Sequence, residues 1–304
     1  YLKSASTPVL ENVVFTQNNA NNSGGGIGLK DDANIEAENL TISENIAEGL
    51  GGGLYINNAD PTFSFALITD NTASSGGGIY IRNNSEIDLT NITLANNNAG
   101  LYGDGIYMRD NSVVNLLNSV LWNNGESQIY FRSEGTEVEL NVSYSIVENN
   151  QNGVETNSNG DLNWLDGNLD SEPYFCSSSA GNYFVRENSP CLNGGLDGGL
   201  IGCLSAGCGP INLGPVWYVD SNGDNSSDGS LETPFETIAW ACNAASNGDT
   251  IRLSSGVYTG SVDFQGKFLV LESRAFELND STIIDETFFG PSLVGGNCFT
   301  LEGP

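Results

Sequence analysis

One short pattern returns along the first half of this chain at an almost constant interval. An apolar residue, one or two polar residues and an Asn recur with spacings of 27, 26, 26, 27 and 26 residues, and the Asn positions are Asn18, Asn45, Asn71, Asn97, Asn124 and Asn150. A glycine-rich triplet opens the next unit at 24–26, 51–53, 76–78 and 103–105. A fixed period of this length indicates a stack of similar units, because no single unit can bury its apolar face alone.

Within each unit the apolar residues alternate with period two, as in "GIYI" at 78–81 and "EIDLTNITL" at 86–94. The alternation predicts short strands, and Gly and Asn supply the turns between them. A coil of two or three strands per unit, paired with the coils above and below at about 4.8 Å, makes an all-β parallel β-helix with coils of 26–27 residues. A β-propeller blade needs about 40 residues per repeat and fits this spacing poorly.

Stacked coils place equivalent residues in columns along the axis. We expect two inward apolar columns, formed by Ile27, Leu54, Ile79, Ile106 and Ile129 and by Phe15, Ile42, Ile68, Leu94, Leu121 and Val147. The Asn column fits a turn that needs left-handed backbone and amide-to-amide hydrogen bonds between coils.

The pattern "FTQN-N-A…GGG" over residues 1–150 resembles the repeats of right-handed parallel β-helix proteins, including the polymorphic outer-membrane and pectate-lyase-like groups. The stretch "GNLDSEPYF" at 167–175 resembles their closing segment, and the stretch from Trp217 onward resembles their opening segment, with a strand, an Asp-rich loop and a short amphipathic helix that caps the first coils. The resemblance implies β-helix coils over 1–150, a closing segment over 151–208, a linker over 209–215, and over 216–304 the capped start of a second β-helix segment with one short helix. In the family the order is cap, coils and closing segment, so this chain is out of phase with it.

Residues that alternate with the inward residues of the "GIYI" strands are expected to point outward. The first outward column contains Tyr1, Gly28, Tyr55, Tyr80, Tyr107 and Tyr130, and the second contains Lys3, Lys30, Asn57, Arg82, Arg109 and Arg132. Tyr rings suit sugar stacking and Arg suits uronate carboxylates, which predicts a saccharide-binding face.

The resemblance implies a lyase on that face, because pectate-lyase-like enzymes use it with Ca²⁺ on Asp clusters and a Lys or Arg as base. The departures from that pattern are that only Asp104 and Asp110 stand near the face in the sequence, and that the stripe is uniform from coil to coil. Uniformity favours the other interpretations, which are cross-strand Tyr stacking with Arg balancing an acidic wall, or a packing interface.

A second candidate site is the loop "DSNGDNSSDG", in which oxygen-bearing side chains alternate at Asp220, Asn222, Asp224, Ser226 and Asp228. Ca²⁺ accepts six to eight oxygen ligands, so this spacing predicts a Ca²⁺ site. The loop lacks the distal Glu of an EF-hand, and Asp/Gly-rich turns also occur without metal, so both interpretations stay open.

Composition narrows the partners and the compartment. The 304 residues include 38 acidic and 9 basic residues and no His, for a net charge of −29, which disfavours nucleic acid and anionic membranes as partners. No run reaches the about 18 apolar residues of a membrane span. Six Cys, an even number, fit an oxidised, secreted setting, and the candidate pairs are Cys203–Cys208, Cys176–Cys191 and Cys242–Cys298.

These features favour a non-enzymatic extracellular or cell-surface protein that acts as scaffold, adhesin or fibre unit. The alternative is a polysaccharide lyase or glycan-binding module that uses the Tyr/Arg face. Tyr1-Leu2-Lys3 aligns with residues 28–30, so the first residues fall inside a coil. Stacking 216–304 of one copy on residue 1 of the next would restore the family order and give a filament, ring or tandem array. A fragment of a longer β-helix protein is the plainer alternative.

Overall fold

The computed structural model describes residues 1–4, 6–209, 214–259, 262–264, 266–267, 269–278 and 287–290. The chain divides into two compact units, Tyr1–Cys208 and Gly209–Pro304. Each unit is described by itself below.

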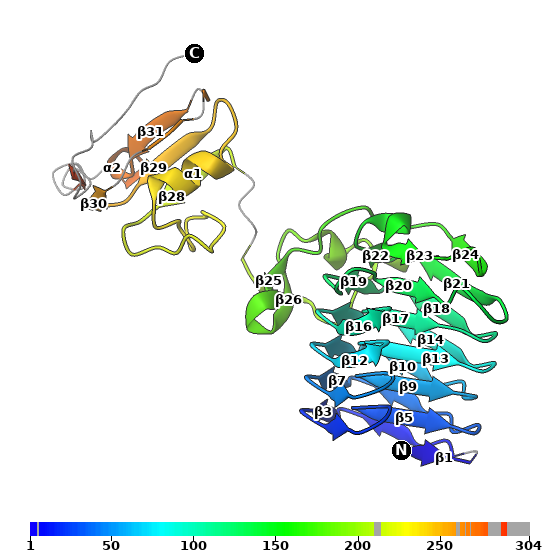
Figure 1. The fold of residues 1–304 in the computed structure, drawn as a ribbon. Helices are drawn as coiled ribbons and strands as arrows, with labels where there is room; N and C mark the ends of the chain where they lie inside the picture. Colours follow the sequence, from blue (N-terminus) through cyan, green and yellow to red (C-terminus); the bar gives the residue numbers. More distant parts are fainter. Residues whose placement is uncertain are drawn as a thin grey trace. The chain divides into compact units, whose positions relative to one another are not determined.

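The first unit is a stack of coils whose strands pair in parallel between coils (Figure 1). Among residues 1–4 and 6–208, sheet A contains β1 (Leu2–Lys3), β5 (Ile27–Lys30), β9 (Leu54–Asn57), β13 (Ile79–Arg82), β17 (Ile106–Met108), β20 (Ile129–Phe131) and β23 (Val154–Glu155). Sheet B contains β2 (Val9–Glu11), β6 (Glu36–Glu38), β10 (Thr62–Ser64), β14 (Glu86–Thr90), β18 (Val113–Leu117), β21 (Val138–Ser143) and β24 (Gly160–Trp164). The predicted all-β parallel β-helix is therefore confirmed, and its coils continue past residue 150 to Trp164.

Two smaller sheets complete the coils, and sheet C has six strands while sheet D has four. Sheet C contains β3 (Val14–Thr16), β7 (Thr41–Ser43), β11 (Leu67–Thr69), β15 (Thr93–Ala95), β19 (Val120–Trp122) and β22 (Ile146–Val147). Sheet D contains β4 (Asn19–Ala20), β8 (Ile46–Ala47), β12 (Thr72–Ser75) and β16 (Asn98–Tyr102). The glycine triplets lie where sheet D passes into sheet A, and a Cβ on Gly52 would come within 2.4 Å of the carbonyl oxygen of Gly77 in the next coil. Coils this close leave room for hydrogen only, which explains the triplets.

The core lies between the sheets, and both predicted columns are part of it. The first column pairs in register from coil to coil, and all its members are buried: Ile27, Leu54, Ile79, Ile106 and Ile129. The column from Phe15 to Val147 pairs in the same way. Phe15 is only partly buried, whereas the other members of its column are buried.

The Asn column forms the predicted amide ladder. Asn45 donates from Nδ2 to Oδ1 of Asn71 at 3.0 Å, and Asn71 donates in turn to Asn97 at 2.9 Å. The prediction of left-handed backbone at these Asn was wrong by one residue except at Asn150, whose own φ is 57°. At the other Asn the positive φ belongs to the preceding position, such as Glu44 at 57° and Asp70 at 58°. The left-handed residue turns the chain, and the Asn that follows it is then aimed into the coil.

The amide ladder does not include the last Asn of the sequence repeat. Asn124 donates from Nδ2 to Oε1 of Gln128 at 2.7 Å, so a Gln replaces the next Asn. Asn150 instead begins the 3₁₀ helix η1 (Asn150–Gly153).

Residues 170–208, which we call the returning segment, run back along the outer face of sheet C. The segment contains β25 (Phe175–Ser177), η2 (Ser178–Ala180), β26 (Asn182–Arg186), η3 (Pro190–Leu192), η4 (Leu196–Gly198) and β27 (Ala206–Cys208). Val120 and Ile146 pack against its Val185, Cys191 and Ile201. Figure 1 shows β25 and β26 beside β19, in agreement with the packing of Val185 on Val120.

The disulfide pattern differs from the sequence expectation. Cys176 on β25 is bonded to Cys208 on β27, so the pairs Cys203–Cys208 and Cys176–Cys191 were wrong. Cys191 and Cys203 are free thiols, and burial raises the pKa of each to about 11. Cys242 is a buried free thiol, while Cys298 lies outside the described residues.

The second unit contains a parallel sheet with strand order β28 (Val216–Val219), β29 (Thr250–Leu253) and β31 (Val270–Ser273). The expected short helix is α1 (Ile238–Ala244), which buries Ile238, Ala241 and Cys242 against the sheet. The remaining elements are β30 (Gly256–Thr259), α2 (Ala275–Leu278) and β32 (Thr287–Gly290), and β30 pairs with β32 in parallel. Within the described ranges, no helix has the length and apolarity needed to cross a membrane.

Candidate functional site

The outward Tyr residues of sheet A form a continuous stack, which we call the Tyr ladder: Tyr55, Tyr80, Tyr107 and Tyr130. Neighbouring ring centroids lie 5.8, 4.8 and 5.5 Å apart, with interplanar angles of 19°, 5° and 17°. Parallel pairing of identical residues at the strand spacing forces this arrangement. Tyr102 extends the stack sideways, with its ring 4.8 Å from that of Tyr130.

The Tyr ladder is buried although it lies on the outer face. Its members are between 3 and 8% exposed, because each ring covers the next. Burial and the neighbouring Tyr80 raise the pKa of Tyr107 to about 12. The ring faces are occupied by one another, so the geometry matches cross-strand stacking and leaves no open ring face in the ladder for a sugar.

Below the ladder, Gly28 interrupts the Tyr column and Lys30 takes over its contacts. The Lys30 ammonium lies 5.2 Å from the ring centroid of Tyr1 and 5.1 Å from that of Tyr55. A cation between two ring faces is stabilised by the ring quadrupoles. A Cβ on Gly28 would come within 2.6 Å of the Tyr1 ring, which explains the glycine.

The second outward column places Arg82, Arg109 and Arg132 around a single carboxylate. Asp110 lies 2.5 Å from Nε of Arg109, 3.8 Å from Arg82 and 3.9 Å from Arg132. The three Arg side chains are 21–31% exposed, and Arg132 also lies 3.8 Å from the exposed Glu134. The Nε of Arg82 is buried and has no hydrogen-bond partner among residues 1–4 and 6–208. We call Arg82, Arg109, Arg132 and Asp110 the Arg cluster.

The carboxylates of Asp104 and Asp110, which lie near this face, are both engaged in interactions within the first unit. Asp104 is buried and accepts hydrogen bonds from the backbone N of Ala99 at 2.7 Å and of Glu126 at 2.9 Å. Asp110 is held by guanidinium groups, so neither carboxylate is presented as a free acid or base. The chemistry that the face offers is the recognition of an anion by guanidinium groups.

The Asp-rich loop of the second unit satisfies its carboxylates locally. Asp220 accepts from the backbone N of Asn222 at 2.9 Å, Asp224 from that of Ser226 at 2.8 Å, and Asp228 from that of Ser230 at 3.0 Å. Each Asp therefore closes its own turn. Within the described ranges, no three Asp, Glu, Cys or His side chains are grouped so that they could hold a metal ion. Ca²⁺ binding by this loop stays a prediction.

A comparison with protein-family models identifies the family of the first unit. The model of the right-handed β-helix region matches residues 25–189, which is more than half of the chain. The chain belongs to the right-handed β-helix family. The comparisons with curated proteins and with solved structures return no match. The matched span covers most of the β-helix coils, including the Tyr ladder and the Arg cluster, and it ends within the returning segment.

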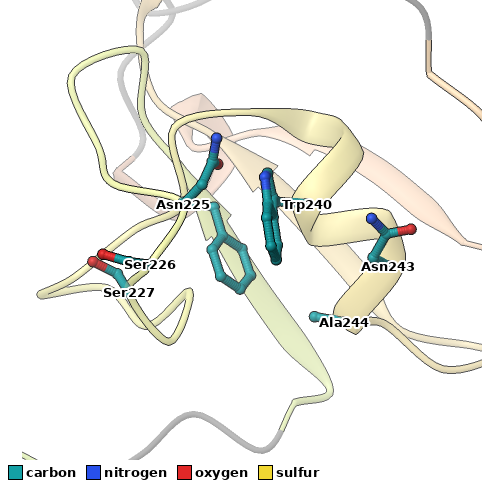
Figure 2. Close-up of a pocket in the computed structure, with 7 residues that line it drawn as sticks. Asn225, Ser226, Ser227, Trp240, Asn243 and Ala244 are labelled. Atoms are coloured by element: carbon teal, nitrogen blue, oxygen red, sulfur yellow. The ribbon is translucent and has the colours of Figure 1, made fainter. Parts of the chain in front are cut away.

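Beyond the span matched to the right-handed β-helix family, the second unit has an open cleft of about 520 Å³ between the Asp-rich loop and α1. Its lining residues are Asn225, Ser226, Ser227, Phe235, Trp240, Asn243 and Ala244 (Figure 2). This cleft was not predicted from the sequence. A signal was present, because Ile238, Ala241 and Cys242 define the inward side of α1 and so place Trp240 on the outward side.

Proposed function

We propose that this protein is a non-enzymatic, extracellular structural or adhesive element of the right-handed β-helix family. The observation that carries the proposal is the uniformity of the ladders. The Asn column, the apolar columns and the Tyr ladder repeat from coil to coil, and the side chains of these columns contact one another. A catalytic centre needs groups with different roles at one place, whereas identical groups in successive coils stiffen the stack of coils.

End-to-end association is the assembly that we propose for this stack of coils. A parallel coil offers its backbone N–H and C=O groups along the axis, so it can pair with any further coil of matching spacing, in the same chain or in another molecule. The second unit starts another parallel sheet, which supports an array of such segments in series. A head-to-tail contact between residues 216–304 and the coil of residues 1–30 is heterologous and would propagate into a filament or ring, or recur along a tandem array.

Electron microscopy of the isolated native material tests the assembly. Long fibres with an axial repeat of one chain length would support it. Short monodisperse particles at every concentration tested would contradict it. Secretion is tested separately, by detecting Cys176–Cys208 as an oxidised pair in material taken from outside the cell.

The second candidate function is binding or cleavage of an acidic polysaccharide. The specific observation in its favour is the Arg cluster, in which three guanidinium groups share Asp110 and the Nε of Arg82 has no partner within the first unit's described residues. The stacked Tyr rings would then serve as a support for the Arg side chains. Formation of unsaturated products from polygalacturonate, followed by absorbance with and without Ca²⁺, decides between the candidates. Turnover that is lost in Arg109→Ala and Arg132→Ala would replace the structural proposal.

A further inference from the structure

The cleft of the second unit has one apolar wall built around Trp240. The Trp240 side chain is 50% exposed, whereas the neighbouring Phe235 is only 5% exposed. The Phe235 ring is fixed from behind by Trp217, with the two centroids 6.1 Å apart and an interplanar angle of 17°. Single exposed apolar residues are ordinary on a protein surface. Trp240 differs from them because it forms one wall of a cleft, and the adjoining Phe235 ring is held in place by Trp217.

The opposite wall is polar and held in place by hydrogen bonds. Oδ1 of Asn225 accepts from the backbone N of Glu236 at 3.1 Å and of Thr237 at 3.0 Å, which ties the loop to the start of α1. Ser226 donates from its hydroxyl to Asp224 at 2.8 Å. Figure 2 shows Asn225, Ser226 and Ser227 on the loop, with Trp240 on the helix across from them. A cleft fixed in this way loses little ordering entropy when a ligand enters.

Charge around the cleft selects against anions. Hydrogen bonds from the backbone and the hydroxyl of Ser226 lower the pKa of Asp224, which favours the charged form of this carboxylate. Glu236 lies beside Asn225, with 3.3 Å between Oε2 and Nδ2. Lys267 donates to the main-chain oxygens of Cys242 and Asn243, so its charge is directed at the end of α1. A ligand that enters the cleft therefore meets two carboxylates on the loop side and one ammonium at the end of α1, an excess of negative charge.

We propose that this cleft binds a neutral hexopyranose unit of a glycan. The C–H face of a pyranose ring packs on the indole of Trp240, and its hydroxyl groups donate to the hydroxyl oxygens of Ser226 and Ser227 on the rim. The site differs in place and chemistry from the Arg cluster, which would take an anion. The proposal goes beyond the structural function proposed above, because it would let the protein attach to a glycan through its second unit.

The test is ligand-observed saturation-transfer NMR on the full chain. The probes are methyl β-D-glucopyranoside, methyl β-D-galactopyranoside and N-acetylglucosamine, with galacturonate as the anionic comparison. We expect at least one neutral probe to bind with a Kd on the order of 1 mM, as befits a ligand of this size. Galacturonate should bind at least tenfold more weakly in the cleft.

Variants assign the signal to the cleft. Trp240→Ala should weaken binding at least tenfold, and Ser227→Asp should weaken it as well while keeping the indole in place. Leu231→Ala is the matched control, because Leu231 is 41% exposed in the same unit and does not line the cleft. Thermal melts of all three variants show that the second unit is folded.

Three results would overturn the proposal. The first is no binding of any neutral probe at 50-fold the expected Kd. The second is binding that survives in folded Trp240→Ala. The third is a preference for galacturonate that the Arg cluster variants Arg109→Ala and Arg132→Ala leave unchanged. None of these results bears on fibre formation, so this proposal and the structural proposal fail separately.

Discussion

The outer faces of sheets A and C both bury side chains, but they do so by different means. On sheet A the Tyr ladder covers itself, and its members are between 3 and 8% exposed. On sheet C the column Thr93, Val120 and Ile146 is at most 2% exposed because the returning segment lies over it. Lower in the same column Val14 is 63% exposed.

The difference shows what a repeat can and cannot specify. A face that covers itself needs the same residue in every coil, and β9, β13, β17 and β20 each supply a Tyr. A face covered by a separate segment has no such requirement, so Thr, Val and Ile can share one column. A self-covering face is local and regular, whereas the covered face depends on contacts between residues far apart in sequence.

The largest effect is expected where the Tyr ladder loses a central ring. Tyr80→Ala removes a 3% exposed side chain that stacks on both Tyr55 and Tyr107. Truncation of a buried aromatic residue costs about 3–5 kcal/mol of unfolding free energy. Urea denaturation of the two proteins measures the difference.

Tyr102→Ala is the matched control for this loss. Tyr102 is 51% exposed and stacks on Tyr130 from one side, so its removal should cost less than about 1 kcal/mol. Equal losses in the two variants would mean that burial in the ladder does not contribute to stability.

The next effect concerns the cover of sheet C. Cys176 and Cys208 lie 32 residues apart, so loss of their bond in Cys176→Ser/Cys208→Ser should lower the unfolding free energy by about 3 kcal/mol. Hydrogen exchange should rise at Val120 and Ile146, which the returning segment covers, and stay unchanged along the Tyr ladder. Cys203→Ser, which changes a free thiol, is the control. Uniform exchange throughout the first unit would show that the two faces unfold together.

The fold of the coils could be predicted from the sequence because every determinant recurs. The spacing of the Asn residues fixed the coil length, and alternation fixed which residues of "GIYI" face inward. The columns from Ile27 to Ile129 and from Phe15 to Val147 followed from these two rules. The left-handed position was displaced by one residue, because Gln17, Glu44 and Asp70 differ in type and hide the pattern.

The parts that could not be predicted are those without a period. Tyr183 meets Asp70 across 113 residues, and no spacing rule reports such a contact. Six Cys allow 15 connectivities, and the chosen pair depends on how the returning segment lies. At the candidate site, the Tyr and Arg columns were predicted by residue, but the sharing of Asp110 by three Arg depends on side-chain reach.

A smaller effect is expected from removing the hydrogen bonds by which Tyr183 of the returning segment contacts the coils. The Tyr183 hydroxyl donates to Oδ2 of Asp70 at 3.0 Å and accepts from Nδ2 of Asn96 at 2.7 Å. Tyr183→Phe should cost about 1–2 kcal/mol, because a buried polar pair loses its partner while the ring stays. Asp70→Asn keeps an acceptor and should cost less. A Tyr183→Phe protein as stable as the parent would place the attachment of the returning segment in the apolar cluster of Val185, Cys191 and Ile201 alone.

The smallest effect is the alkaline titration of the Tyr ladder. Burial raises the pKa of Tyr107 from 10.0 to about 12, so the folded state holds this proton more tightly than the unfolded state. Stability from this group is therefore complete below pH 10 and is lost as the pH rises from about 10 to about 12. The loss is on the order of 1 kcal/mol after allowance for solvent screening at the ring edge. Tyr107→Phe should flatten that part of the stability curve, measured by urea denaturation at each pH with tyrosinate absorbance as the titration signal.

The returning segment offers the contrast, since Cys176→Ser/Cys208→Ser should lower the whole curve of stability against pH without changing its slope. A Tyr107→Phe curve parallel to that of the parent would mean that the ladder opens before it ionises, and that the self-covering face is the weaker of the two.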